Sequence, residues 1–374
     1  MALKTEWQWH YLERDHVEAA ANAGTLRVKL PVREQISAIE VEIRAIRHVT
    51  GYIYTTPIYS LPEKIEVIAD GAKILYSMVP ETAMFVHFFT MKTVPYLELS
   101  MTGYSWNVFR VKIPFGRHLR DEEWMLDTSV YNNVYLEIPW ALPIASWTTF
   151  TFQYTIRYLR PIQKLSPKGF VRSRDIEYGA HGWTAAGHYY VDLPLKYPWR
   201  VLGCRIWDPD QKVENDITHI KLDIDDGRLV LVDDDLDDLV LIDTERLPYP
   251  IHVHYMHNHL AAVTTNHVYT CLGYGQELSG MLMGGTQGSL FHEGFFGQEV
   301  AYWVYDHLGA AVDSRANLTI HGAMYFCNVM IKDWFGGEPF PVEEHSEAQI
   351  DYTHGAFTVD DLRTWIQEYC PMSI

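Results

Sequence analysis

The sequence repeats itself at long range, and this constrains the fold more than any other feature. Val28–Ile43 (VKLPVREQISAIEVEI) aligns without a gap with Val191–Ile206 (VDLPLKYPWRVLGCRI), at an offset of 163 residues. Downstream, Lys64–Leu75 (KIEVIADGAKIL) matches His219–Leu231 (HIKLDIDDGRLVL), and each segment has the pattern of two strands joined by an Asp-Gly turn. An internal repeat of this kind indicates two copies of one structural unit in tandem.

The residues between these motifs are typical of β-structure. Runs rich in Val, Ile, Thr, Tyr and Phe are separated by Pro, Gly and Asp-Gly turns. Both halves close on alternating strands, at Thr149–Tyr158 and at Ala323–Lys332. Two units of about 150 residues with many short strands favour a duplicated sandwich or jelly roll. We therefore predict an all-β fold of two tandem jelly rolls, a double jelly roll.

Short helices are predicted only at the N- and C-terminal ends. Thr5 and Gln8 have the spacing of a capping box, which predicts a helix ending at Gly24. Thr358 can cap a second helix, with Leu362 and Ile366 on its apolar face. The predicted organisation is a helical segment 1–24, a first jelly roll 25–160, a linker 161–187, a second jelly roll 188–335 and an acidic C-terminal tail with a helix 336–374.

Net charge excludes one class of partner. The 374 residues carry 30 Lys and Arg against 48 Asp and Glu, a net charge of −18, of which residues 214–243 contribute −9 and residues 336–374 contribute −7. Direct binding of nucleic acid needs an excess of basic residues, so we exclude it. The four cysteines are too few for a disulfide framework. The first fifteen residues lack a signal-peptide pattern, which predicts synthesis in a cytoplasm.

The paired VKLP and VDLP strands, the paired Asp-Gly hairpins and the closing strands carry a resemblance that covers Val28–Lys332. On these features the chain resembles the double jelly-roll major capsid proteins of tailless icosahedral viruses, the lineage of adenovirus hexon and membrane-containing bacteriophages. The resemblance implies homotrimers of pseudo-sixfold outline that tile an icosahedral capsid. It implies a structural virion protein, not an enzyme, without cofactors. The implied partners are copies of itself, minor capsid or penton proteins and, in viruses that have one, an internal membrane.

A segment of low charge offers an enzymatic alternative. Leu247–Tyr305 contains no Lys, Arg or Asp, and its only charged side chains are Glu277, Glu293 and Glu299. A carboxyl group isolated in apolar surroundings has a raised pKa, which suits general acid catalysis. A buried structural Glu is the competing interpretation.

One motif within this segment resembles a catalytic one. Gly273, Gly275 and Glu277 (GYGQEL) look like the Gly-x-Gly-x-Glu-Asp motif of a glycoside hydrolase family that acts on fructofuranose and arabinofuranose linkages and shares the trimeric double jelly roll. Leu278 stands where that family has Asp. The resemblance implies Glu277 as the nucleophile of a trimeric furanoside hydrolase. A retaining mechanism also needs a second carboxylate, for which Glu293 or Glu299 is the candidate.

A histidine cluster is the candidate for metal binding. His252, His254, His257 and His259 lie in the octet HVHYMHNH. On a strand, His252 and His254 share one face, which suits two ligands of a zinc or nickel ion. A polar strand with exposed imidazoles explains the same pattern. In a trimer interface, protonation of these side chains at about pH 6 would weaken assembly.

An acidic run leaves a further alternative open. Asp233–Asp238 (DDDLDD) lacks the spacing of an EF-hand, so it is either a solvated loop or a cation site that bridges subunits. A carbohydrate-binding β-sandwich with exposed Trp and Tyr is a third functional class. The sequence assigns no catalytic, cofactor-binding or metal-binding residue, and a structural capsid role remains the preferred prediction.

Overall fold

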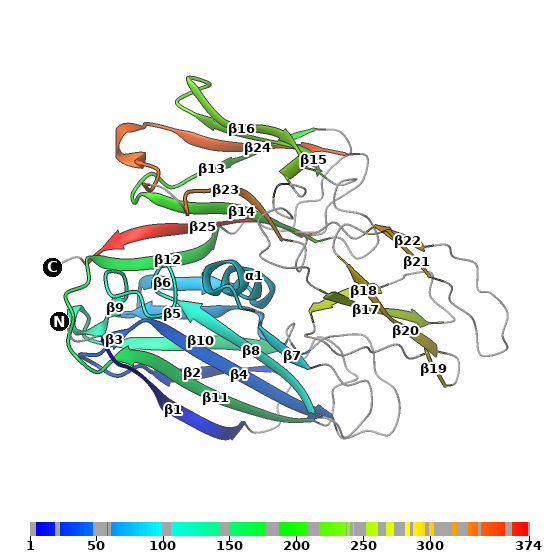
Figure 1. Ribbon diagram of the computed structural model, residues 1–374, viewed down its shortest axis with the longest axis horizontal. Helices are drawn as coiled ribbons and strands as arrows, with labels where there is room; N and C mark the ends of the chain where they lie inside the picture. Colours follow the sequence, from blue (N-terminus) through cyan, green and yellow to red (C-terminus); the bar gives the residue numbers. More distant parts are fainter. Residues whose placement is uncertain are drawn as a thin grey trace. The chain divides into compact units, whose positions relative to one another are not determined.

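The protein folds into two compact units built almost entirely from β-strands (Figure 1). The first unit comprises Met1–Asp175 and Gln367–Ile374, and the second comprises Ile176–Ile366. The prediction of an all-β fold is confirmed. The computed structural model describes residues 5–18, 23–47, 58, 61–93, 95–98, 106–141, 150–176, 187–207, 217–236, 238–239, 242, 252–260, 267–272, 281–284, 287–295, 299–302, 316–319, 328–335, 338–355 and 361–372, without side chains between 252 and 319.

The described part of the first unit contains two large sheets and a small one. One has the order β1-β11-β4-β8-β7. Its strands are β1 (Trp7–Glu18), β11 (Phe150–Pro161), β4 (Ala38–Arg47), β8 (Trp106–Pro114) and β7 (Tyr96–Glu98). The other has the order β2-β10-β5-β6-β12, followed by the last residues of β25. Its strands are β2 (Ala23–Lys29), β10 (Val134–Ala141), β5 (Ile65–Ala69), β6 (Lys73–Met78) and β12 (Gly169–Ile176). The short strands β3 (Gln35–Ile36) and β9 (Leu126–Asp127) pair with each other in a separate two-stranded sheet, and the 3-10 helix η2 (Thr128–Val130) follows β9.

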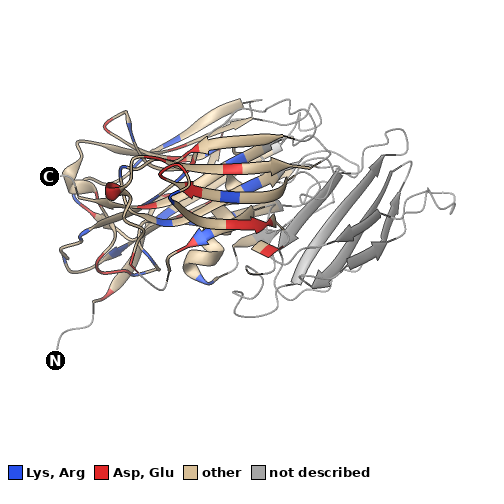
Figure 2. Ribbon diagram, turned by 90° about the horizontal axis from the view of Figure 1, so that it is seen from above, with Lys and Arg blue, Asp and Glu red and all other residues tan. Residues whose placement is uncertain are grey.

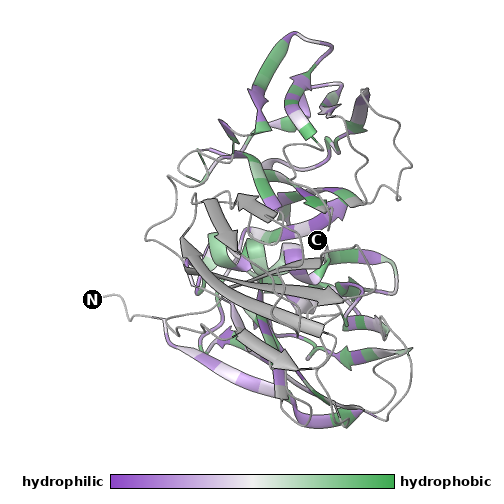
Figure 3. Ribbon diagram, turned by 90° about the vertical axis from the view of Figure 1, so that its right-hand side faces the viewer, coloured by the Kyte–Doolittle hydropathy of each residue, from purple (hydrophilic) through white to green (hydrophobic). Residues whose placement is uncertain are grey.

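Alternation of apolar and polar side chains explains how these sheets pack. Along β10 every second residue is buried, and Figure 3 shows the same alternation of green and purple along the described strands. Trp140 of β10 stacks on Phe152 of β11, with ring centroids 5.4 Å apart. The buried faces of the two sheets therefore meet in a sandwich core.

Within the described residues of the first unit, one α-helix, α1 (Pro80–Met91), packs against β8. Pro80 occupies the first turn, where its missing N–H costs no hydrogen bond, and Lys92 ends the helix in the left-handed conformation with φ 54°. Ten of its twelve residues are buried, so the helix is enclosed on nearly all sides. Among the described residues, no helix has the length and apolar character that crossing a membrane requires.

The second unit also contains two sheets in its described core, with orders β13-β24-β15-β16 and β25-β14-β23. These strands are β13 (His188–Asp192), β24 (Ala348–His354), β15 (Ile217–Ile224), β16 (Leu229–Asp235), β25 (Asp361–Pro371), β14 (Trp199–Trp207) and β23 (Asn328–Asp333), with the 3-10 helix η4 (Val342–Glu344). Further strands are β17 (His252–Leu260), β18 (His267–Leu272), β19 (Met281–Gly284), β20 (Gln287–Phe295), β21 (Glu299–Tyr302) and β22 (Ala316–Thr319).

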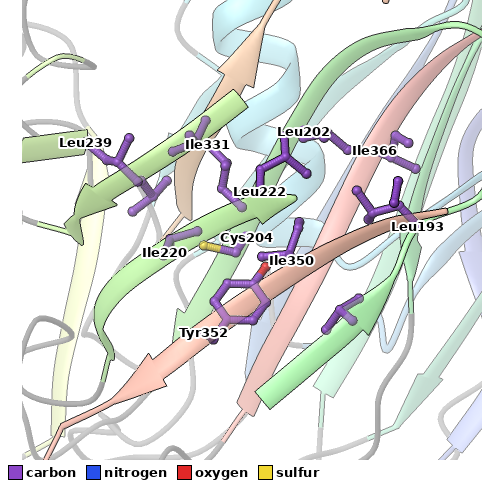
Figure 4. Close-up of a cluster of buried hydrophobic side chains, with 14 of the residues drawn as sticks. Leu193, Leu202, Cys204, Ile220, Leu222, Leu239, Ile331, Ile350, Tyr352 and Ile366 are labelled. Carbon is purple, nitrogen blue, oxygen red and sulfur yellow. The ribbon is translucent and has the colours of Figure 1, made fainter. Parts of the chain in front are cut away.

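Figure 4 shows the apolar core of the second unit. Leu202 and Cys204 of β14 lie in one cluster with Leu222 of β15 and Ile350 of β24. The Tyr352 hydroxyl lies 2.8 Å from the Thr364 hydroxyl, a hydrogen bond that satisfies a buried phenol.

The two units repeat one four-stranded sheet, as the sequence repeat predicts. The order β2-β10-β5-β6 corresponds strand by strand to β13-β24-β15-β16. Both predicted Asp-Gly hairpins form, β5–β6 and β15–β16. Each turns through residues of positive φ, including Gly71 at 73° and Gly227 at 82°, which glycine adopts without strain. Each hairpin also has a register shift at the same aligned position, after Val67 and after Leu222.

The hairpin turns are anchored in the same way in both units. The backbone N–H of Asn132 donates to Asp70 Oδ1 at 2.9 Å, and the backbone N–H of Ser346 donates to Asp225 Oδ1 at 2.8 Å. In each unit the aspartate opens the turn, and its partner lies two residues before β10 or β24. The duplication therefore extends to individual hydrogen bonds.

Both predicted terminal helices are wrong. Trp7–Glu18 forms strand β1, which pairs antiparallel with β11, and Asp361–Pro371 forms strand β25. Neighbouring strands supply the backbone hydrogen bonds that the local helical pattern would have made internally. The proposed cap Thr358 lies outside the described residues.

The C-terminal segment 336–374 is not a tail beyond the two sandwiches. β24 lies between β13 and β15, and β25 lies beside β14. Strand order therefore makes β25, and not the predicted Ala323–Lys332, the counterpart of the closing strand β11. The stretch 161–187, predicted as a linker, contains β12.

Candidate functional site

The residues of the predicted hydrolase motif, Gly273, Gly275 and Glu277, lie outside the described residues. Of the two candidate second carboxylates, Glu293 lies in β20 and Glu299 begins β21, where only the backbone is described. The hydrolase interpretation therefore stays a prediction.

The histidine cluster lies on β17, which pairs antiparallel with β18 on one side and β20 on the other. His254 stands opposite Cys271 and Glu293 in this backbone register. The side chains of His252, His254, His257 and His259 lie outside the described residues, so metal binding there stays a prediction.

The acidic run at Asp233–Asp238 is described except for Asp237, and two of its carboxylates contact one histidine. His219 Nε2 lies 2.8 Å from Asp233 Oδ1, and His219 Nδ1 lies 2.9 Å from Asp235 Oδ1. The hydrogen bond to Asp235, followed by the one to Asp233, raises the pKa of His219. Within the described residues, no group of three or more His, Cys, Asp or Glu side chains has the arrangement of a metal site. Two carboxylates of the run thus pair with an imidazole, and cation binding by the run stays a prediction.

A cluster of ion pairs lies on the face of β4 that points away from the sandwich core. Glu40 and Glu42 are buried, although Ile39, Val41 and Ile43 occupy the core face of the same strand. Glu40 Oε1 lies 2.7 Å from Arg157 Nη2 of β11, and Glu42 Oε1 lies 2.5 Å from Arg44 Nε. Further basic groups contact the same carboxylates, Arg110 at Glu42 and Lys112 at Glu40. Basic side chains thus cover both acids, and Figure 2 likewise shows both signs of charge interspersed over the described strands.

A second buried acid joins the last strand of the chain to β12. Glu368 of β25 is fully buried, and Arg172 donates to its Oε2 from Nε at 2.9 Å and from Nη2 at 2.7 Å. Arg174 donates to the same oxygen from Nε at 3.0 Å. Next to this pair, Gln367 Nε2 donates to Ser173 Oγ at 2.9 Å. A charge-assisted clamp therefore fixes the final residues of β25 within the first unit.

A buried histidine in α1 is held in one neutral tautomer. The backbone N–H of Lys112 donates to His87 Nδ1 at 3.1 Å, so the proton of the ring lies on Nε2, 3.0 Å from Thr93 Oγ1. Burial, together with the charge of Lys112, lowers the pKa of His87 to about 3. No local sequence pattern marks His87, because its environment is created by α1 and β8 together.

Solved structures of other proteins have a similar fold. No family model and no curated protein matches the chain. Among solved structures, the chain is similar to the STIV major capsid protein at 10% identity and a TM-score of 0.58, over 97% of this chain and 96% of that one. A chain in the atomic structure of Sulfolobus Turreted Icosahedral Virus matches at 12% identity and a TM-score of 0.56, over 98% of this chain and 91% of that one. At these identities the likeness shows the fold, and it confirms the resemblance to double jelly-roll capsid proteins at that level.

Proposed function

We propose that the chain is the major capsid protein of an icosahedral virus, and that it assembles as a homotrimer before forming the shell. The observation that carries this proposal is the likeness of fold to the STIV major capsid protein across 97% of the chain. The duplicated sheet order supports it further, because three copies of a duplicated chain present six similar units. Six similar units in a ring can make equivalent contacts with neighbouring trimers in a closed lattice.

The partners and location follow from this role. A chain of net charge −18 repels phosphate at close range, so a minor protein or an internal membrane separates it from the genome. Minor capsid or penton proteins would fill positions in the lattice that the trimer does not. The protein is made in the host cytoplasm and resides in the virion. Its role needs no catalysis and no cofactor.

Mass and shape in solution test the proposal. The purified full-length chain should elute as a particle of about 130 kDa by light scattering, three times its mass of 43.4 kDa. Negative-stain electron microscopy should show particles with threefold symmetry and a hexagonal outline. A monomer at all concentrations would overturn the proposal. Hydrolysis of an arabinofuranoside by the wild type, lost in Glu277→Gln, would identify the hydrolase instead.

A further inference from the structure

Strands β1 and β12 hold equivalent places in the duplicated fold. β1 precedes β2 and pairs with the closing strand β11, while β12 precedes β13 and lies beside the closing strand β25. The hydrogen bonds that follow the two closing strands also correspond. The N–H of Ile162 donates to Glu6 O at 2.8 Å, and the N–H of Met372 donates to Lys168 O at 3.3 Å. Glu6 and Lys168, which are 162 positions apart, are therefore equivalent residues of the two units.

Among the described strands, β12 has two neighbours, whereas β1 has one. β12 pairs in parallel with β6, where Ser173 stands opposite Tyr76 and Arg174 opposite Ser77. The counterpart of β6 in the second unit is β16, the second strand of the repeated hairpin. Among the described strands, β1 and β16 each stand at the end of a sheet. The chain thus makes the pair β6–β12 internally and leaves its duplicate, β16–β1, unmade in the described structure.

The unpaired edges of β1 and β16 both carry exposed apolar side chains, at positions that a parallel pairing would bring side by side. Tyr11 of β1 is 53% exposed, and Leu229 and Val230 of β16 are 39% and 41% exposed. Parallel pairing would bring the first half of β1, with Trp9 and Tyr11, alongside these residues of β16. Unpaired backbone groups flanked by apolar side chains are the features that recruit an added strand.

The alignment of the two pairs sets the register. Tyr11 occupies the place of Ser173 and Leu12 that of Arg174, while Asp233 of the second hairpin occupies the place of Ser77. Leu12 would therefore stand opposite Asp233. Residues opposite each other on neighbouring strands lie within the range of Cα separations that a disulfide bridges.

We propose that β1 of one copy of this chain pairs in parallel with β16 of a second copy. β1 and β16 of one chain do not pair with each other in the described structure, and we assign the missing partner of each to a second copy. A contact between two different surfaces is head-to-tail, and it closes into a ring when the rotation permits. In a ring of three copies, every one of the six units has the same parallel strand on its hairpin. The inference rests on the proposed function and names the contact that builds its trimer.

Cysteine cross-linking tests the pairing in the full-length chain. The variant with both Leu12→Cys and Asp233→Cys should, under mild oxidation, give covalent dimers and trimers on a non-reducing gel. The matched control joins Leu12→Cys to Asp192→Cys, which places the second thiol on β13 at the opposite edge of the same sheet. All proteins carry Cys271→Ser and Cys327→Ser, and the remaining Cys204 and Cys370 are buried. The control and the parent protein should therefore remain monomeric on the gel.

The outcomes separate the strand pairing from the capsid function. Cross-linked trimers in the first variant alone support the pairing. If light scattering shows intact trimers while the first variant cross-links no more than its control, the pairing is overturned and the capsid proposal stands. If the wild type forms no oligomer at any concentration, both proposals are overturned.

Discussion

Removing the charge of Glu368 should destabilise the protein more than any change to an exposed acid. The Glu368 carboxylate is fully buried, while the side chains of Arg172 and Arg174 are 17% and 27% exposed. Glu368→Gln keeps the shape of the side chain but removes the negative charge that the guanidinium groups of Arg172 and Arg174 contact. Removing one partner of a buried ion pair costs about 3–5 kcal/mol, and the partial exposure of both arginines favours the lower value. A loss of about 3 kcal/mol in a unit of this size corresponds to a fall of about 6–12 °C in unfolding temperature.

Thermal unfolding at a fixed protein concentration measures this fall, because association shifts the midpoint with concentration. The matched control is Glu123→Gln. Glu123 lies 2.9 Å from Arg117 and 3.3 Å from Lys168 but is about half exposed, so water replaces the lost contacts. The control should unfold close to the wild-type temperature. If the two variants unfold at the same temperature, the clamp does not stabilise the fold and the reasoning is wrong.

Two further changes probe the interior. The folded pKa of His87, about 3, lies below its ordinary value of 6.5, so the unfolded chain binds the proton first and the free energy of unfolding falls as pH drops below 6.5. The free energy of unfolding should fall by up to about 1.4 kcal/mol per pH unit. Urea titrations at several pH values should show that this free energy depends less on pH in His87→Gln than in the wild type. Equal pH dependence in both proteins would contradict the burial of a neutral ring. Gly203→Ala places a Cβ 2.1 Å from the Trp365 ring and should cost about 1–3 kcal/mol in urea unfolding. Gly187→Ala, which meets open space, is its control and should be unaffected; similar costs would show that crowding at Trp365 is not the cause.

The hairpins were predictable because their signals are local. The segments around Asp70 and Asp225 each combine β-forming residues with an Asp-Gly turn, and the positive φ of the turn residues is what such a turn requires. The sequence repeat extended the prediction from the hairpins to the whole fold, since two similar hairpins that follow two similar strands indicate two similar units.

The terminal strands were mispredicted for opposite reasons. In β1, Trp7, Trp9 and Tyr11 alternate with polar residues, a strand signal that the capping-box spacing of Thr5 and Gln8 outweighed. In β25, residues from Thr364 to Cys370 are buried on both faces, so no alternation remains to identify a strand. α1 escaped prediction in the same way, because a helix buried nearly all round has no polar face.

The buried charge clusters were beyond the reach of the sequence. Arg172 and Glu368 lie 196 positions apart, and only the return of β25 to the first unit brings them together. Glu40 and Glu42 stand in an alternating strand and look like ordinary exposed residues. Their burial depends on basic side chains from β8 and β11 that lie over them.

The path of β25 delays completion of the first unit during synthesis. The first unit is complete only when Gln367 and the residues after it have joined it, yet its other residues end at Asp175. At about 5–20 residues per second, a ribosome takes roughly 10–40 s to make the intervening chain. During that interval Arg172 and Arg174 have been made but Glu368, the acid that they contact in the finished protein, has not. A chain that is released before β25 is made lacks Glu368 permanently, so its first unit differs from that of the full-length protein.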